Sequence, residues 1–173
     1  MNKLKRVAVL LFALLSCVGC DQATKTVAQR QLRVAEPQSY FGDLIRFEYA
    51  ENPGAFLSLG AGLAETQQYW IFTVVVAIIL IGFLLLAVRE SYRLHPAILI
   101  ACALYLGGGI GDLIDRVLHE GRVIDFMSIG VGSLRTGIFN IADMAIMAGS
   151  VLIVWFAYRF QSSHDTVQPK RDR

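Results

Sequence analysis

The stretch from Tyr69 to Val88 holds twenty consecutive residues without a charge. About 20 apolar residues in a helix cross the hydrocarbon core of a bilayer, so this stretch predicts a transmembrane helix. The composition of the whole chain agrees, because 55% of its 173 residues are hydrophobic and only 17% are charged. In soluble domains the charged share is nearer a quarter. The chain is therefore expected to be a membrane protein, and its length favours one compact unit.

Further apolar segments bring the predicted spans to four, at about 7–27, 69–88, 96–114 and 141–160. The first is short, since Val7 to Cys20 holds only fourteen uncharged residues. A stretch of that length also suits a signal peptide, and Leu14-Leu15-Ser16-Cys17 resembles the site where lipoprotein precursors are cut. We expect the segment to be retained, because a chain with three further spans cannot travel as a lipid-anchored secreted protein. The retained helix places Asp21 and Lys25 at i and i+4, where they can pair.

The distribution of basic residues predicts the orientation of the spans. Three short segments carry nine of the sixteen Lys and Arg residues: Lys3, Lys5, Arg6, Arg89, Arg93, Arg159, Lys170, Arg171 and Arg173. The two longer segments, about 21–68 and 115–140, carry the other seven. Short loops rich in Lys and Arg stay in the cytoplasm, so both termini are expected there and the longer segments outside. The tail, 161–173, is expected to be disordered.

The longer segments are predicted to contain short strands. Residues Ile45 to Tyr49 alternate between apolar and polar, as a half-buried strand does. Further short strands are predicted within Val123 to Met127 and Ser133 to Phe139. The sequence therefore predicts a mainly α membrane protein of one domain, 1–160, with four transmembrane helices and a small extracytoplasmic β-sheet.

Ionisable and amide residues gather at the outer ends of the predicted spans. A charged residue at the centre of a span costs about 2.5–3.5 kcal/mol on insertion scales, so such residues are functional candidates. They are Asp21, Lys25, Asp112, Asp115, Arg116, Asn140 and Asp143, joined by Asn52 and Asp125 from the outer segments. Two adjacent carboxylates can share one proton, so that one activates a water while the other protonates a carbonyl oxygen. Such a pair can hydrolyse a peptide bond without a metal or a Ser or Cys nucleophile.

Simpler roles for these residues stay open at this stage. Asp115 and Arg116 could pair with each other, and Asn140 could cap the helix that follows it. The run Gly107 to Gly111 is typical of close helix packing. The cysteines lie in apolar segments without a second ligand pair, so no metal or cofactor is expected, and a net charge of +2 does not indicate nucleic acid binding. The residues alone leave two classes open: a membrane hydrolase and a proton-coupled transporter.

Five motifs narrow this choice. They are D-Q-A-T-K at 21–25, N-P-G-A at 52–55, G-G-G-I-G-D-L-I-D-R at 107–116, V-I-D-F at 123–126 and F-N-I-A-D at 139–143. In order and spacing they resemble the motifs of bacterial lipoprotein signal peptidase (signal peptidase II). The resemblance implies an aspartic endopeptidase of the bacterial inner membrane, with four helices and an outer β-cradle. Its implied substrate is a diacylglyceryl-modified prolipoprotein, cut just before the lipidated cysteine.

The resemblance also implies roles for single residues. The catalytic pair falls on Asp125 and Asp143. Five further residues are implied to line the substrate site: Asn52, Gly54, Asp112, Arg116 and Asn140. Three others are implied to support it: Asp21, Lys25 and Asp115. Besides the substrate, membrane lipid and globomycin-type inhibitors are the implied partners. We expect the protein to act as a monomer.

Two residues depart from the family pattern. Asp112 stands where the family usually has Asn, and Phe56 stands where it usually has a small residue. Asp112 could raise the pKa of the dyad or alter substrate fit, and Phe56 could narrow the pocket. Both changes leave the dyad intact, so an active peptidase is favoured over an inactive paralogue that only binds precursors. A transporter is less favoured, since its acids should lie near the membrane midplane and internal repeats are common in that class.

Overall fold

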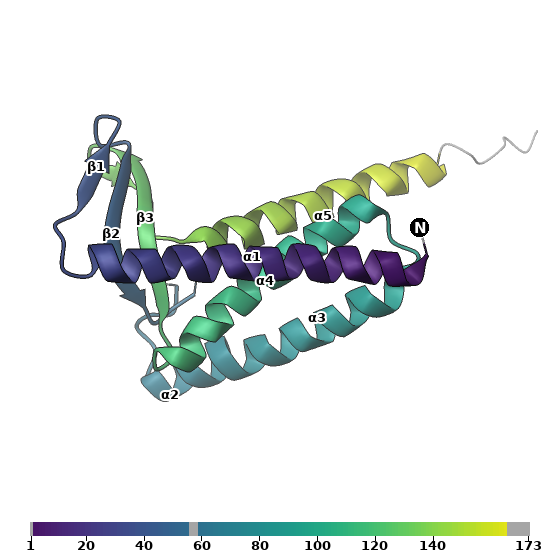
Figure 1. Ribbon diagram of the computed structural model, residues 1–173, viewed down its shortest axis with the longest axis horizontal. Helices are drawn as coiled ribbons and strands as arrows, with labels where there is room; N and C mark the ends of the chain where they lie inside the picture. Colours follow the sequence, from purple (N-terminus) through teal and green to yellow (C-terminus); the bar gives the residue numbers. More distant parts are fainter. Residues whose placement is uncertain (1, 56–58, 166–173) are drawn as a thin grey trace, which may run out of the picture.

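The fold is that of a computed structural model, which describes residues 2–55 and 59–165. Its helices and strands, in chain order, are α1 (Lys3–Leu32), β1 (Gln38–Tyr40), β2 (Ile45–Asn52), α2 (Glu65–Gln68), the π-helix η2 (Tyr69–Val75), α3 (Val76–Glu90), α4 (Pro96–Leu118), β3 (Val123–Val131), β4 (Leu134–Arg135) and α5 (Ile141–Asp165). The long helices run side by side, and the sheet lies across one end of them (Figure 1). The predicted fold class, a mainly α membrane protein with a small sheet, is confirmed.

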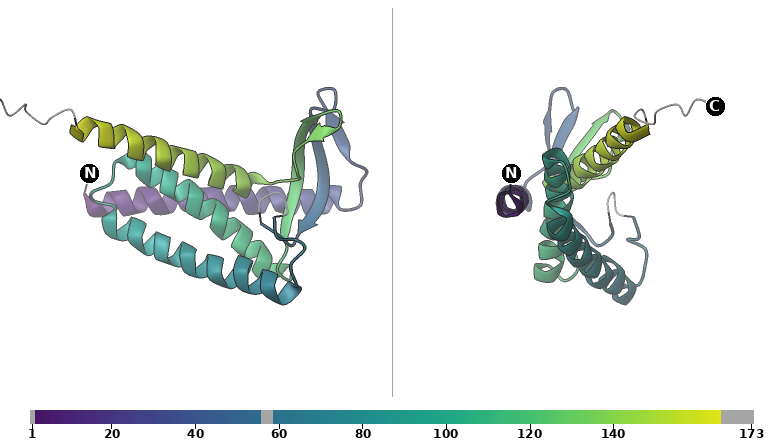
Figure 2. Two further views of the ribbon diagram at one scale, coloured as in Figure 1. Left: turned by 180° about the vertical axis from the view of Figure 1, so that it is seen from behind. Right: turned by 90° about the vertical axis from the view of Figure 1, so that its right-hand side faces the viewer.

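Four helical stretches among the described residues are long and apolar enough to cross a membrane: Lys3–Leu32, Glu65–Glu90, Pro96–Leu118 and Ile141–Arg159. The second is a continuous run of α2, η2 and α3. The start of α1 and the far end of α5 lie at the same end of the molecule, opposite the sheet (Figures 1 and 2). Helix α5 extends to Asp165, so the tail predicted to be disordered begins as helix, and residues 166–173 lie outside the described part.

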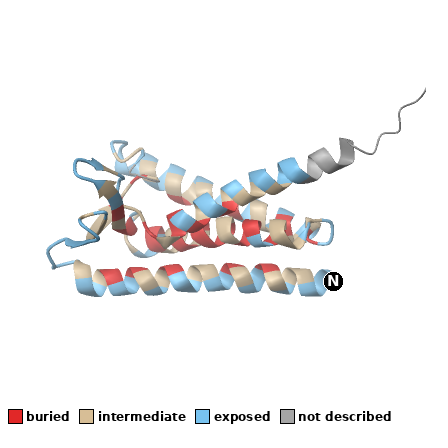
Figure 3. Ribbon diagram, turned by 90° about the horizontal axis from the view of Figure 1, so that it is seen from above, coloured by how far each residue is buried: buried red, intermediate tan, exposed pale blue. Residues whose placement is uncertain are grey.

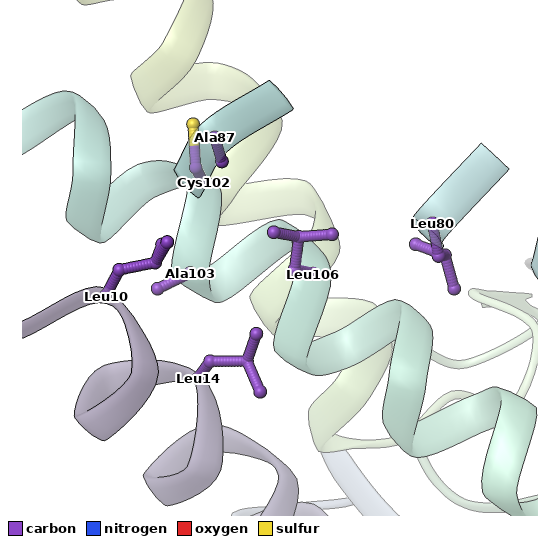
Figure 4. Close-up of a cluster of buried hydrophobic side chains, with 7 residues drawn as sticks. All are labelled: Leu10, Leu14, Leu80, Ala87, Cys102, Ala103 and Leu106. Carbon is purple, nitrogen blue, oxygen red and sulfur yellow. The ribbon is translucent and has the colours of Figure 1, made fainter. Parts of the chain in front are cut away.

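Helix α1 is continuous through Cys17, the residue that resembles a lipidation site. Its buried residues recur at helical spacing and face the other helices, as the red stripe in Figure 3 shows. Two of them, Leu10 and Leu14, precede Cys17 and belong to the main apolar cluster, together with Leu80, Ala87 and Leu106 (Figure 4). The guanidinium of Arg6 also donates to the backbone oxygens of Ser91 and Leu94, in the turn between α3 and α4. The segment before Cys17 is therefore an integral part of the packing.

Helix α4 lies at the centre of the bundle, and its glycine run sets how closely the other helices approach. A Cβ at Gly107 would overlap Cys17 of α1, and one at Gly109 would overlap Leu80 of α3. At Gly108 the added Cβ would meet a backbone atom, the carbonyl oxygen of Ala142 in α5. Three successive glycines thus face three different helices, which agrees with the packing role typical of such runs.

The Gly108→Ala substitution is expected to destabilise the protein. Because the obstacle is a backbone oxygen of α5, only a shift of the helix relieves the overlap, and overpacking of this kind costs about 1–3 kcal/mol. The control is Gly82→Ala in α3, where a Cβ meets nothing within 4 Å. That change should be neutral or stabilising by up to about 1 kcal/mol, since Ala favours a helix over Gly. Thermal unfolding in detergent should order the variants in this way, and equal midpoints would contradict the packing role.

The sheet is antiparallel, with strand order β1-β2-β3-β4. The pairing of β2 with β3 shifts register between Phe47 and Ala50, which inserts one extra residue into β2 as a β-bulge. Beyond the bulge, Ala50 lies opposite Asp125, and Asn52 lies opposite Val123. The sheet thereby carries Asp125 to the ends of the helices. The strands predicted within 45–49 and 123–127 lie inside β2 and β3, whereas β1 was not predicted.

Candidate active site

Asp125 lies on β3 with only 2% of its surface exposed. Its two carboxylate oxygens accept hydrogen bonds from two side-chain amides. The Nδ2 of Asn52, from the paired strand β2, donates to Oδ2 at 2.9 Å, and the Nδ2 of Asn140 donates to Oδ1 at 2.7 Å. Amide groups at these positions fix the carboxylate without neutralising its charge. The β-bulge and the start of α5 together determine where this carboxylate lies.

Asp143 lies in the first turn of α5, where Asn140 forms the cap. The backbone N–H of Asp143 donates to Oδ1 of Asn140 at 2.9 Å, and the backbone N–H of Asn140 donates to Oδ2 of Asp143 at 3.2 Å. This reciprocal pair is a capping box, which satisfies two otherwise unpaired N–H groups at the helix start. Asn140 therefore binds both carboxylates, Asp125 through its side chain and Asp143 through its backbone. Asn140 thus forms the predicted helix cap and also lies beside the acids.

Burial raises the pKa of Asp125 to about 6, because the charged form loses its hydration. The hydrogen bonds from Asn52 and Asn140 act in the opposite direction and lower this pKa, whereas the negative charge of Asp112 raises it. A carboxyl group with a pKa near 6 can either hold or accept a proton close to neutral pH. Asp125 is thus suited to general acid-base chemistry.

A cavity of about 480 Å³ opens beside these carboxylates. One part of its wall is polar and contains Asn52, Asp112, Arg116, Asp125 and Asp143. The other part is apolar and runs down between the helices, with Phe72, Val76, Leu113, Ile146, Met147 and Val151. Such a cavity suits a ligand that has a polar reacting group attached to an apolar body.

Arg116 holds together the loops that surround the polar part of the cavity. Its guanidinium donates to the backbone oxygens of Pro53 (3.5 Å) and Gly54 in one loop, and to that of Gly121 (2.7 Å) in another. It also lies 5.4 Å from the ring centroid of Phe72, within the range of a cation–π contact. The predicted possibility that Arg116 pairs with Asp115 is wrong, because Asp115 pairs with Lys25 instead.

Lys25 is almost fully buried and lies among three carboxylates. Its Nζ is 2.9 Å from Asp21, 2.8 Å from Asp112 and 3.0 Å from Asp115. The predicted i to i+4 pair of Asp21 and Lys25 is confirmed, but the two partners from α4 were not foreseen. We call these four residues the Lys25 cluster. The single positive charge of Lys25 balances only part of the negative charge of the three carboxylates. Burial makes the uncompensated charge costly.

The Lys25 cluster reaches the backbone next to each candidate catalytic residue. The Oδ1 of Asp21 accepts from the N–H of Ala142 at 2.9 Å, and the Oδ2 of Asp115 accepts from the N–H of Ile124 at 3.0 Å. Ala142 directly precedes Asp143, and Ile124 directly precedes Asp125. The cluster thus joins α1 and α4 to both chain segments that carry the dyad.

The structure brings together all the residues that were predicted to form or support a site. Asp125, Asp143, Asn52, Arg116, Asp112 and Gly54 line the cavity. Asn140 was also predicted to line the site, but it is fully buried behind the wall, where it binds Asp125, and the supporting residues Asp21, Lys25 and Asp115 lie behind the wall with it. Phe56 lies outside the described residues. The apolar wall of the cavity, which includes Phe72, was missed, and so was Gln22, whose Nε2 donates to the Asp115 carboxylate at 3.0 Å. Gln22 belongs to the D-Q-A-T-K motif, whereas nothing in the sequence distinguishes Phe72 from its apolar neighbours.

Four apolar spans with a buried acid–amide site at one end define a multi-pass membrane protein equipped for acid-base chemistry. The family profile for signal peptidase (SPase) II matches residues 13–159. A lipoprotein signal peptidase of Streptomyces coelicolor is 36% identical over 168 residues, which cover 94% of this chain and 76% of that protein. One of Moorella thermoacetica is 36% identical over 146 residues, or 84% and 89% of the two chains. The chain therefore belongs to the signal peptidase II family and is a membrane peptidase.

Solved structures agree with the fold. One, described as a bacterial membrane enzyme, matches with a TM-score of 0.75 at 25% identity, covering 96% of this chain and 94% of that one. A second bacterial membrane enzyme matches with a TM-score of 0.71 at 24% identity, over 87% and 93% of the two chains. The arrangement of four helices and a terminal sheet is thus one that solved membrane enzymes share.

Proposed function

We propose that this protein is an intramembrane aspartic endopeptidase that cleaves diacylglyceryl-modified prolipoproteins just before the lipidated cysteine. Asp125 and Asp143 are the proposed catalytic residues. One observation carries the mechanism: Asn140 binds both carboxylates at the polar part of a cavity whose other part is apolar. Two carboxyl groups held by one residue can share a single proton, as general acid-base hydrolysis requires.

The proposed reaction needs one carboxyl group ionised and the other protonated. The ionised group takes a proton from a water, whose oxygen attacks the scissile carbonyl carbon, while the protonated group donates to the carbonyl oxygen. When the tetrahedral intermediate collapses, one hydroxyl returns its proton to the carboxylate that had donated it, the carbonyl re-forms and the C–N bond breaks. The proton taken from water passes to the leaving amine. The pKa of Asp125, about 6, suits a group that changes protonation during turnover. Because the proposed pair shares one proton, neither role is assigned to one residue alone.

The two parts of the cavity fit the two parts of such a substrate. The apolar wall of Phe72, Val76 and Ile146 suits acyl chains, which reach it from the membrane. Asn52, Gly54 and Arg116 surround the dyad and would contact the peptide around the scissile bond. By the same reasoning the pocket is where a globomycin-type inhibitor would bind. The proposed location is the bacterial inner membrane, and the charge distribution supports an orientation with both termini cytoplasmic and the sheet outside.

Complementation tests this proposal in cells. A bacterium depleted of its own lipoprotein signal peptidase accumulates unprocessed, diacylglyceryl-modified prolipoprotein, and production of this protein should restore the mature form. The matched control is the Asp143→Asn variant, produced at the same level, which should leave the precursor unprocessed. If the wild-type protein reaches the membrane and the precursor persists, the proposed activity is wrong, and the chain is better described as a binding paralogue.

A further inference from the structure

The Lys25 cluster contains one carboxylate that differs from the other two. The side chains of Asp21 and Asp115 are 0% and 1% exposed, whereas that of Asp112 is 18% exposed and forms part of the cavity wall. Asp21 and Asp115 accept hydrogen bonds from backbone N–H groups beside the dyad. Asp112 instead lies within hydrogen-bonding distance of the side chain of Asn140. Its Oδ1 is 2.8 Å from Nζ of Lys25 and 3.4 Å from Nδ2 of Asn140.

We propose that Asp112 is a positioning residue of the active site, which ties the Lys25 ammonium to the side chain of Asn140 and adds a negative charge to the cavity wall. The inference rests on the proposed function, because its effect is exerted on the dyad. It also gives a role to one of the two residues at which this chain departs from the family pattern. In the described structure Asp112 forms no hydrogen bond with Asp125 or Asp143, so it acts through Asn140.

The geometric part of this role depends on the amide of Asn140. Its Nδ2 carries two hydrogens and faces three oxygens, those of Asp125 (2.7 Å), Ile124 (3.3 Å) and Asp112 (3.4 Å). Its Oδ1 accepts from the backbone N–H of Asp143. An acceptor on the Asp112 side keeps the amide nitrogen turned towards Asp125 and the amide oxygen towards α5. Loss of that acceptor leaves the amide held by Asp125, Ile124 and the N–H of Asp143 alone, which loosens the position of a donor of Asp125.

The electrostatic part depends on the charge of Asp112. The charged groups that act on Asp125 are Asp112 and Arg116 from α4, Lys25 from α1 and Asp143 from α5, and its amide partners are Asn52 and Asn140. Among these, the Asp112 carboxylate disfavours ionisation of Asp125 and raises its pKa. Removal of that charge should shift the whole pH–rate profile of the dyad to lower pH.

Two substitutions separate the geometric effect from the electrostatic one. Asp112→Asn keeps an acceptor oxygen for Lys25 and Asn140 but removes the charge. The maximal kcat of this variant should stay within about threefold of wild type. Both limbs of its pH–rate profile should lie about half a pH unit or more below those of wild type. Asp112→Ala removes the acceptor as well, so kcat at its own optimum should fall by about 10–100-fold, with KM changed by less than about threefold.

The experiment measures kcat and KM against pH for full-length protein in detergent, with a synthetic diacylglyceryl-modified prolipoprotein peptide as substrate. The control for charge removal is Glu36→Gln, an exposed carboxylate in the segment after α1, whose profile should match wild type. Thermal unfolding confirms that each variant is folded, and rates are compared only among folded variants. Asp112→Glu, which keeps the charge but extends the chain, provides a second geometric variant if Asp112→Ala does not fold, with reduced kcat expected.

Several results would overturn the inference. An unshifted profile for Asp112→Asn would exclude the electrostatic role. Wild-type kcat in the folded Ala or Glu variant, or an equal loss in Asn and Ala, would exclude the bridge to Asn140. If wild-type protein cleaves the peptide while the Asp112 variants fail these expectations, only this inference is wrong. If the wild-type protein itself does not cleave, the proposed function is wrong.

Discussion

Asp125→Asn and Asp143→Asn should each abolish cleavage of diacylglyceryl-modified prolipoprotein. An amide is close in shape to a carboxyl group, but it can neither take up a proton from water nor deliver one to a carbonyl oxygen. General acid-base catalysis contributes about 10²- to 10⁴-fold, so turnover should fall at least 100-fold in each variant. Initial rates of product formation by full-length protein, with the synthetic substrate peptide, measure this loss.

The double variant provides a sharper test than either single one. Because the two carboxyls act as one unit, Asp125→Asn combined with Asp143→Asn should be no slower than the single variants. Glu36→Gln, the same chemical change at an exposed position, should keep the wild-type rate. Asp143→Asn should unfold close to the wild-type temperature, since its amide oxygen can still accept the hydrogen bond from the N–H of Asn140. Asp125→Asn should unfold at a somewhat lower temperature, because it keeps one acceptor oxygen for the two amides of Asn52 and Asn140. More than a few per cent residual turnover in either single variant would contradict the assignment of the dyad.

Lys25→Met should have the largest effect on stability. Lys25 is the only cation paired with Asp21 and Asp115 in the described structure, and both carboxylates are almost fully buried. Removal of one partner from a buried ion pair costs about 3–5 kcal/mol, because the remaining charge is left uncompensated. At about 2–4 °C per kcal/mol for a chain of this size, the unfolding midpoint should fall by about 10 °C.

Two further variants test the cause of this loss. Arg30→Met removes an exposed basic residue from the same helix and should change stability by less than about 1 kcal/mol. Asp21→Asn added to Lys25→Met removes one of the uncompensated charges, so it should recover part of the lost stability. A double variant that unfolds at a lower temperature than Lys25→Met would show that the loss comes from packing and not from charge.

Much of the architecture follows from patterns that are local in the sequence. Uncharged runs such as Tyr69 to Val88 have the length of a membrane span, and alternation in Ile45 to Tyr49 indicates a strand. The acids could be grouped before any contact was known, because most lie near the same end of a predicted span and Asp125 lies in the outer segment that connects two of these ends. Membership of the family then explained which two of them form the candidate dyad.

Other features depend on contacts between distant segments and were not predictable in this way. Asp115 lies next to Arg116 in the sequence, yet it pairs with Lys25, because successive residues of a helix point about 100° apart. The π-helix over Tyr69–Val75 carries the same apolar pattern as an α-helix, so its wider turns leave no local signal. Phe72, within that π-helix, reaches the cavity and Arg116 only through this backbone geometry and the packing around it.

The position of the cut tests the central claim most directly. Purified wild-type protein is incubated with a prolipoprotein peptide in two forms, one with the diacylglyceryl group on its cysteine and one without it, and the products are analysed by mass spectrometry. The account predicts two products from the modified peptide, a released signal peptide and a fragment that begins with the lipidated cysteine. Both should disappear with Asp143→Asn, and the unmodified peptide should be cleaved far more slowly. A cut at another bond, or equal cleavage by wild type and Asp143→Asn, would contradict the account.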